Sequence, residues 1–414
     1  MEPLFQSLAE AQKHVDGFIY PNEIELHWGL LICLYPYLTG LVAGAFILAS
    51  LNKLFNVAEL KPTYRLSMLT SLAFLLCATL PLVAHLGHHE RFYEILMTPN
   101  PTSAMAMFGF VYAWYLMAVL LLEIWFDYRK DLILWARRER FPMKLIHRAL
   151  ALFSSDLSEK ALRFDDKAVK RITMIGVPSA FLLHGYVGFI FGSVKANPWW
   201  SSVIMPVVFL FSAIVSGIAL VFLLYMITCL LRHQSIDMKC ADKLADLLLY
   251  AMLVDFALEI LDFVHRVYEA EESIDILAQL LMQKLFVSLI VVQLLLGMML
   301  PLALLGITRI KRRTTPEEMR RLVYVASTVL VQVGIFSMRW NVVVGGQLFS
   351  KSLRGLMTYK TDLLGLEGLL TAMAILILPL VILYVLAKIL PPWPESRADA
   401  VPPAPSAPVP ATAS

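Results

Sequence analysis

The sequence predicts an all-α fold: a polytopic transmembrane helix bundle of about nine spans. Hydrophobic residues make up 59% of the 414 residues and charged residues only 16%. Apolar stretches of about 20 residues recur along the chain, which is the length a helix needs to cross a bilayer. No polar interval between them is long enough for a separate water-soluble domain. The expected spans are 26–51, 66–87, 104–126, 172–194, 201–230, 244–266, 277–306, 319–340 and 363–389.

The orientation follows from the distribution of Lys and Arg between these spans. Alternate loops (52–65, 127–171, 231–243 and 307–321) contain 24 of them, whereas the N-terminal segment and the remaining loops contain seven. Because basic loops stay in the cytoplasm, the N-terminus is expected outside and the C-terminus in the cytoplasm. Nine spans agree with that parity.

Three segments outside the spans have their own character. Residues 1–24 are expected to form a periplasmic segment; they carry acids and lack the basic start of a signal peptide. Residues 127–171 form a basic cytoplasmic insertion, in which 131–153 mixes apolar and basic residues and could lie on the membrane surface as an amphipathic helix. A basic linker that faces anionic lipid is favoured over a segment that docks a partner. Residues 391–414 are rich in Pro and Ala, which predicts a disordered tail after a transmembrane domain of residues 25–390.

Ionisable residues inside the spans gather at one depth, toward the outside. Asp255, Glu259 and Asp262 follow the i, i+4, i+7 spacing that places them on one helix face. Charges in hydrocarbon are costly, so such a set favours a site or a proton path. For single residues structural explanations stay open: Lys284 could neutralise Glu259 or Asp262. The other members at this depth are His27, His85, His184, Tyr186, Arg339 and Glu367.

Several small residues predict close helix contacts, and the cysteines predict packing. Gly40 and Gly44, and the Gly185-Gly188-Gly192 series, have the spacing that lets two helices approach closely. The cysteines contain no CxxC pair, so we expect packing roles rather than iron–sulfur ligation. They are Cys33, Cys77, Cys229 and Cys240.

Neither metal nor nucleotide motifs stand out. The histidines His27, His85 and His184 could ligate one haem at most, because all lie on the outer side and a transmembrane haem pair needs four axial ligands. No Rossmann, Walker or zinc spacing occurs where a soluble domain could use it. We expect no metal site, no haem and no nucleic-acid partner.

Four strings resemble one protein family. They are HWGLLICLYPYLTGLVAGAFILASL, LPLVAHLGHHERFYEILMTPNPTSAMAMFGF, GYVGFIFGSVKANPWWSSVIMPVVFLFSAIVSGIAL and FSMRWNVVVGGQLFSKSL. Together they resemble the NrfD/polysulfide reductase membrane-subunit family, and the last is similar to its longer, DsrP- and HybB-like members. The resemblance covers most of residues 25–390. One position departs from it: His85 stands where many members have an Asp.

This resemblance implies a bacterial inner-membrane subunit of a respiratory oxidoreductase. It would bind menaquinol or ubiquinol near the periplasmic side, have no redox centre of its own, and exchange electrons with a ferredoxin-like, multi-cluster iron–sulfur subunit. Quinol oxidation releases two protons, so bases must lie near the head group. Our candidates are, for quinone binding, His27, His85, Tyr186 and Arg339, and for proton transfer, Asp255, Glu259, Asp262 and Lys284.

Two other functions remain open from the sequence. A proton-coupled secondary transporter could use the acidic helix face, although transporters often show inverted repeats and broken helices at the midplane, which are not evident here. A structural membrane anchor would need no site at all. Polar residues clustered toward the outside favour quinone chemistry over transport at the midplane.

Overall fold

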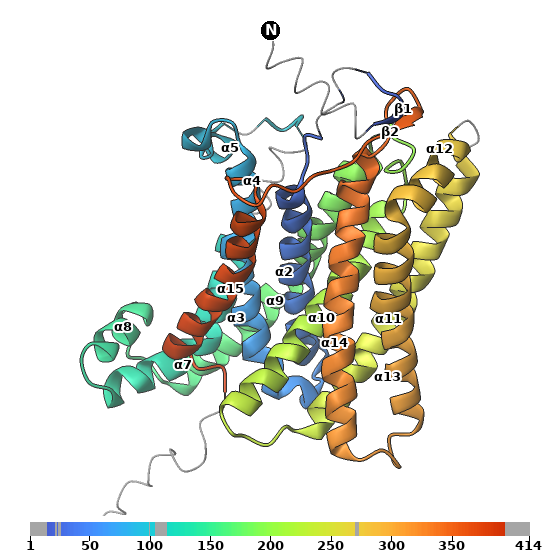
Figure 1. Ribbon diagram of the computed structural model, residues 1–414. Helices are drawn as coiled ribbons and strands as arrows, with labels where there is room; N and C mark the ends of the chain where they lie inside the picture. Colours follow the sequence, from blue (N-terminus) through green and yellow to red (C-terminus); the bar gives the residue numbers. More distant parts are fainter. Residues whose placement is uncertain are drawn as a thin grey trace, which may run out of the picture.

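The protein is a bundle of long helices that run side by side (Figure 1). This computed structural model describes residues 15–20, 23, 26–98, 100–103, 114–269 and 273–393. A short antiparallel pair, β1 (Asp16–Phe18) and β2 (Arg354–Leu356), lies at one end of the bundle. We call this the β end. The opposite end carries the short helix α8 (Met143–Leu150) and is called the α8 end.

Within the described residues, seven helical segments are long and apolar enough to cross a membrane, which confirms the prediction of a polytopic helix bundle. Three of them are built from shorter elements in direct succession. The seven are α2 (Leu30–Phe55), Ala58–His85, α9 (Glu159–Gly192), α10 (Met205–Leu231), Ile274–Ile310, Glu317–Gln347 and α15 (Leu369–Ile389).

Two further spans were expected from the sequence. The span at 244–266 corresponds to α11 (Met238–Glu269), which is long enough but has its apolar run interrupted by acids. The span at 104–126 begins in residues 104–113, outside the described part. From there η4 (Tyr115–Leu120) continues directly into α7 (Leu121–Arg138). The count of nine therefore stays a prediction.

The remaining elements complete these segments or connect them. Segments 1–24 and 391–414 lie largely outside the described residues. The elements are η2 (Ala58–Leu60), α3 (Lys61–Ala78), α4 (Leu80–His85), η3 (His89–Arg91), α5 (Glu94–Met97), α12 (Ile274–Gln279), the π-helix η5 (Leu280–Met299), α13 (Leu300–Ile310), α14 (Glu317–Val343) and η6 (Gly345–Gln347).

The basic insertion at 127–171 is more ordered than a linker. It comprises the last turns of α7, the helix α8 and the start of α9. Buried Arg129 forms a salt bridge of 2.6 Å with Asp165, and the His147 ring lies 2.8 Å from the Ile389 carbonyl oxygen and 2.5 Å from Glu139. These contacts hold α8 at the level where α15 ends.

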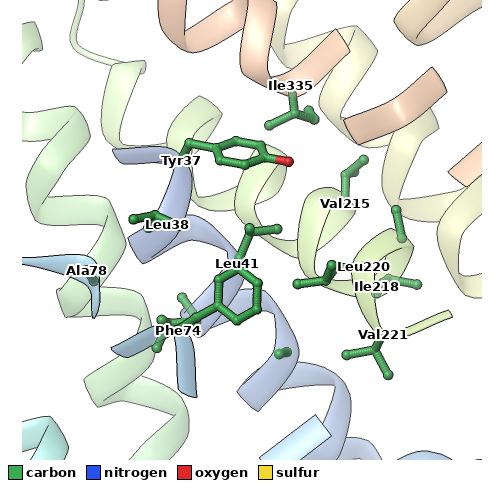
Figure 2. Packing of buried hydrophobic residues seen from close by; sticks show 14 of the residues in the cluster. Tyr37, Leu38, Leu41, Phe74, Ala78, Val215, Ile218, Leu220, Val221 and Ile335 are labelled. Carbon is green, nitrogen blue, oxygen red and sulfur yellow. The ribbon is translucent and has the colours of Figure 1, made fainter. Parts of the chain in front are cut away.

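Helix α2 is the centre of the bundle. It packs against α3, α9, α10 and α14, and almost all of its residues are buried. Figure 2 shows Tyr37 and Leu41 of α2 among side chains of the neighbouring helices. These include Phe74 of α3, Val221 of α10 and Ile335 of α14. A helix that is apolar all round, as α2 is, belongs in such a central position.

Glycines set the closest helix contact. A Cβ added at Gly44 would collide with the Ala213 carbonyl oxygen, and one added at Gly217 would collide with the backbone of Gly44. The backbones of α2 and α10 therefore touch, which confirms the predicted role of Gly44. In α9, Gly188 likewise approaches the Met205 carbonyl oxygen, at 2.7 Å from its added Cβ. Helices in a lipid bilayer are not held together by the hydrophobic effect. Small residues at these points allow the close van der Waals packing that holds them together instead.

We expect Gly44→Leu to force α2 away from α10 and to destabilise the fold by about 3 kcal/mol or more, the upper range for overpacking. Gly306→Leu is the matched control, because nothing lies within 4 Å of a Cβ added at Gly306. The measurement is the thermal unfolding midpoint of the purified chain in detergent. Equal midpoints for both variants would contradict the contact.

Candidate functional site

The C-terminus of α14 is held by side chains from elsewhere in the chain. The indole N–H of Trp199 donates to the Asn341 carbonyl at 2.8 Å, and that of Trp200 to the Val342 carbonyl at 2.6 Å. Gln347 Nε2 donates to the Val343 carbonyl at 2.8 Å. The last carbonyls of a helix have no partner within the helix, and inside a membrane they must find one in the protein. Two tryptophans and a glutamine supply it here.

A cavity of about 420 Å³ lies next to this helix end, at the β end of the bundle. We call it the β-end pocket. Its wall combines the residues that precede α2, the connection between α9 and α10, and the segment that follows α14. Its lining residues are Glu23, Leu26, His27, Trp28, Val194, Ala196, Asn197, Trp200, Gly346, Gln347, Phe349, Lys351, Leu353 and Met357.

The walls of the β-end pocket are fixed by hydrogen bonds and stacking. Gln347 bonds both backbone groups of Trp28, accepting at 3.1 Å and donating at 2.9 Å. The Trp28 and Trp200 rings stack with their centroids 5.5 Å apart. Asn197 Nδ2 donates to the Gly346 carbonyl at 2.7 Å. A Cβ at Gly346 would collide with the Trp200 indole nitrogen, so only glycine fits this position.

Arg339 lies deeper in the bundle, fully buried with His184. Its Nη2 donates to Ser212 Oγ at 2.6 Å and lies 3.1 Å from His184 Nε2. A guanidinium only donates, so His184 Nε2 must accept and its proton must sit on Nδ1. Nδ1 then donates to Thr39 Oγ1 at 3.3 Å, and that hydroxyl donates to the Tyr35 carbonyl at 3.1 Å. The result is a directed hydrogen-bond chain from α14 through α9 to α2.

The three acids of α11 have different surroundings. Asp255 is fully buried, and neither of its oxygens has a hydrogen-bond partner among the described protein residues. Glu259 Oε2 accepts from Gln293 Nε2 at 3.0 Å. Asp262 pairs with Arg266 and accepts from the Ser202 hydroxyl, which ties α11 to the connection before α10. The shared face that the spacing predicted therefore divides into one orphaned, one half-paired and one fully paired carboxyl.

The structure does not bring all the candidates from the sequence into one pocket. His27 lines the β-end pocket, whereas Arg339 belongs to the chain with His184. His85 Nδ1 contacts Glu367 at 2.9 Å, and Tyr186 stacks on Phe189 with their centroids 6.3 Å apart. None of Arg339, His85 and Tyr186 lines that pocket.

The last candidate, Lys284, does not pair with the acids that the sequence suggested as its partners. Its Nζ lies 3.2 Å from Asp16 on β1 and 2.9 Å from Thr358, rather than beside Glu259 or Asp262. Two further residues were missed as site candidates. Trp200 and Gln347 carry no charge, so a pattern of ionisable residues does not include them. The sequence does show the Trp-Trp pair and the Gly-Gly-Gln string to which they belong.

Cysteines and metal ligands add no further centre in the described part of the chain. All four cysteines are free and buried, which confirms their packing role. Among the residues with described positions, no group of three or more His, Cys, Asp or Glu is placed to hold a metal ion.

Known proteins resemble this chain over much of its length. The family described as polysulphide reductase, NrfD matches residues 21–351. A selenate reductase subunit of Mesobacillus selenatarsenatis is 34% identical over 203 residues, which are 48% of this chain and 47% of that protein. A putative dimethyl sulfoxide reductase membrane subunit of Halobacterium salinarum is 32% identical over 202 residues, 47% of this chain and 41% of that protein.

A third relative bears a name that mentions a quinol. The Hdr-like menaquinol oxidoreductase integral membrane subunit of Archaeoglobus fulgidus is 24% identical over 227 residues, 55% of this chain and 49% of that protein. The chain spans about half the length of these curated relatives. The family match covers far more than half of the chain, together with its membrane-spanning helices. The chain is therefore an integral membrane protein that belongs to the NrfD, or polysulphide reductase, family.

Proposed function

We propose that this chain is the quinol-interacting membrane subunit of a multi-subunit oxidoreductase. The observation that carries the proposal is the β-end pocket, which combines an imidazole, two amides and a stacked tryptophan pair at one end of a membrane bundle. A mostly apolar cavity with a few fixed polar groups is typical of small-molecule sites. The named menaquinol oxidoreductase relative supports quinol as the ligand class.

The residues of the pocket fit a quinol head group. Trp28 and Trp200 offer flat apolar faces, and the amides of Asn197 and Gln347 are already fixed by backbone contacts. His27 is exposed to the pocket, and an imidazole is the side chain best suited to exchange protons at neutral pH. Menaquinone or ubiquinone would supply the two-electron chemistry when bound. His27 would accept a proton at a ring nitrogen and pass it toward the β end.

Arg339, His184 and the acids of α11 would act deeper in the bundle than the β-end pocket. Arg339 and Asp255 are both fully buried in the bundle interior. Asp255, Glu259 and Asp262 would carry protons, as would Lys284 near the surface, while His85 and Tyr186 would border the approach of the quinone rather than line this pocket. The transmembrane quinone-binding domain would comprise residues 25–390.

The β end would face the periplasm of a bacterial inner membrane, across nine spans. Lys and Arg crowd the loops at the α8 end, including 127–171, which favours a cytoplasmic position for that end. The N-terminus would then lie outside and the C-terminus inside. A ferredoxin-like iron–sulfur subunit would dock over the β end and exchange electrons with the quinone pocket, and this chain would need no redox centre of its own.

We expect His27→Ala to lower quinol-dependent turnover of the purified complex by about 100-fold, the lower range for loss of a general base. His88→Ala is the matched control, because His88 is exposed near the same end and its side chain pairs with Glu90. Steady-state rates with reduced quinol measure the effect. Unchanged turnover in His27→Ala would remove the pocket from the mechanism and favour a structural anchor.

The orientation can be tested with single cysteines in intact cells. All four natural cysteines are buried, so the background is low. Lys351 at the β end and Ser155 at the α8 end are both exposed. A membrane-impermeant maleimide is expected to label Lys351→Cys from the periplasm and to label Ser155→Cys only after lysis. The reverse pattern would invert the proposed topology.

A further inference from the structure

A second cavity, of about 180 Å³, lies between α11, η5 and α14. We call it the lateral cavity. Its volume is several times the roughly 30 Å³ that one water occupies in the liquid. Ile260 and Phe263 of α11, which the sequence predicts to be a membrane span, line it and remain 44% and 40% exposed. The cavity therefore opens sideways, toward lipid, rather than toward the β end.

The lateral cavity is separate from the β-end pocket. The two share no lining residue, and adjacent tryptophans stand between them: Trp199 lines the lateral cavity and Trp200 lines the β-end pocket. Each indole is fixed by its bond to an α14 carbonyl. A molecule in one cavity thus cannot simply be the tail or head of a molecule in the other.

One hydrogen-bond acceptor in the lateral cavity lacks a partner. Glu259 lines the cavity, and its Oε1 is buried without a hydrogen-bond partner among the described protein residues. The rest of the carboxyl is held in place: Gln293 donates to Oε2, Asn341 donates to Gln293 at 2.8 Å, and Ser288 donates to Asn341 at 2.6 Å. Three successive side chains thus fix this buried carboxyl but leave Oε1 unpaired. Buried acceptors are normally hydrogen-bonded, so a ligand with a donor would complete the site.

Asp262 and Arg266 also line the lateral cavity and form an ion pair with each other. Arg266 lies over the Trp199 ring, 5.5 Å from its centroid, and its buried Nε has no hydrogen-bond partner among the described residues, so it could donate to an oxygen of a ligand. The other walls are apolar, with the aromatic rings of Trp199, Phe256 and Phe263 among them. The fitting ligand is therefore a flat, lipophilic ring that enters from lipid and carries a hydroxyl donor.

We propose that the lateral cavity is a second hydroquinone site, in which Glu259 Oε1 accepts a hydrogen bond from a ring hydroxyl. The proposal rests on the proposed function only for its choice of ligand, because a membrane quinol pool supplies such molecules. While Glu259 is ionised its carboxylate only accepts, and this form of the site selects hydroquinone over quinone, since only the reduced carrier has an O–H donor. The site binds reduced carrier from the lipid and needs no electron transfer of its own.

The test is equilibrium binding of tail-less hydroquinones to the purified full chain under anaerobic reducing conditions. The probes are the dimethylnaphthohydroquinone and ubiquinol head groups, and tryptophan fluorescence and calorimetry give the stoichiometry. We expect two sites per chain. Phe256→Trp, which fills the cavity, should abolish one of them, and Glu259→Gln should weaken that site about tenfold, the loss of one charge-assisted hydrogen bond.

Glu269→Gln is the matched control, because Glu269 lies on the same helix but is exposed, pairs with His265 and does not line the lateral cavity. His27→Ala should abolish the other site and leave this one intact. A single site that His27→Ala removes and Glu259→Gln leaves unchanged would overturn the second site while the proposed function stands. Absence of any binding would overturn both.

Native mass spectrometry separates a quinol from a structural lipid. A phospholipid that stays on the wild-type chain, and leaves in Phe256→Trp, would overturn the hydroquinone assignment. Displacement of that occupant by the naphthohydroquinone, but not by its oxidised form, would support the assignment. All variants should unfold at wild-type temperatures, and Ile260→Trp offers a second way to fill the cavity if Phe256→Trp does not.

Discussion

The buried end of α14 is the constraint on which the other arrangements depend. A helix that ends within or near hydrocarbon leaves carbonyl groups that water cannot reach, and each unpaired group is costly. Trp199, Trp200 and Gln347 pair these carbonyls. Their positions then dictate the connection between α9 and α10 and the backbone before α2, because Gln347 also bonds Trp28.

The burial of Arg339 imposes a second constraint from the same helix. A guanidinium keeps its charge, so each of its donors is costly to bury without an acceptor when water is absent. Arg339 Nε is left without one among the described residues, whereas Nη2 has two side-chain partners. Ser212 of α10 and His184 of α9 accept from it, and its guanidinium carbon lies 4.1 Å from the centre of the Phe209 ring. The cation thereby joins α14 to the helices that surround α2.

The sequence predicts the elements of this fold better than its contacts. Apolar length located the spans, and the small-residue spacing located the contact at Gly44, because both are local properties of the chain. The depth of His27 and Arg339 was likewise readable from the topology. Depth alone does not fix the direction of a side chain around its helix axis relative to other helices. His27 and Arg339 consequently lie in different places although they were expected together.

Lys284 illustrates what local patterns cannot contain. The acids of α11 were the partners that the sequence suggested. The actual partner is Asp16, which lies 268 residues before Lys284 in the chain, on the strand β1 that pairs with β2. That pairing depends on the β-end backbone, which has no periodic signal. The same holds for Trp199 and Trp200: the sequence shows two adjacent tryptophans, but not that their indole N–H groups donate to backbone carbonyls of another helix.

Both cavities are attached to α14, and this has a mechanical consequence. Met338, Asn341 and Val342 line the lateral cavity, whereas Gly346 and Gln347, just beyond the helix end, line the β-end pocket. The carbonyls that the two tryptophans cap belong to Asn341 and Val342, which themselves line the lateral cavity. A shift of the last turn of α14 would break the Trp199 and Trp200 bonds together and would change both cavities at once. Because close-packed interiors deform in discrete steps rather than continuously, occupancy of one cavity would be felt in the other through this single turn.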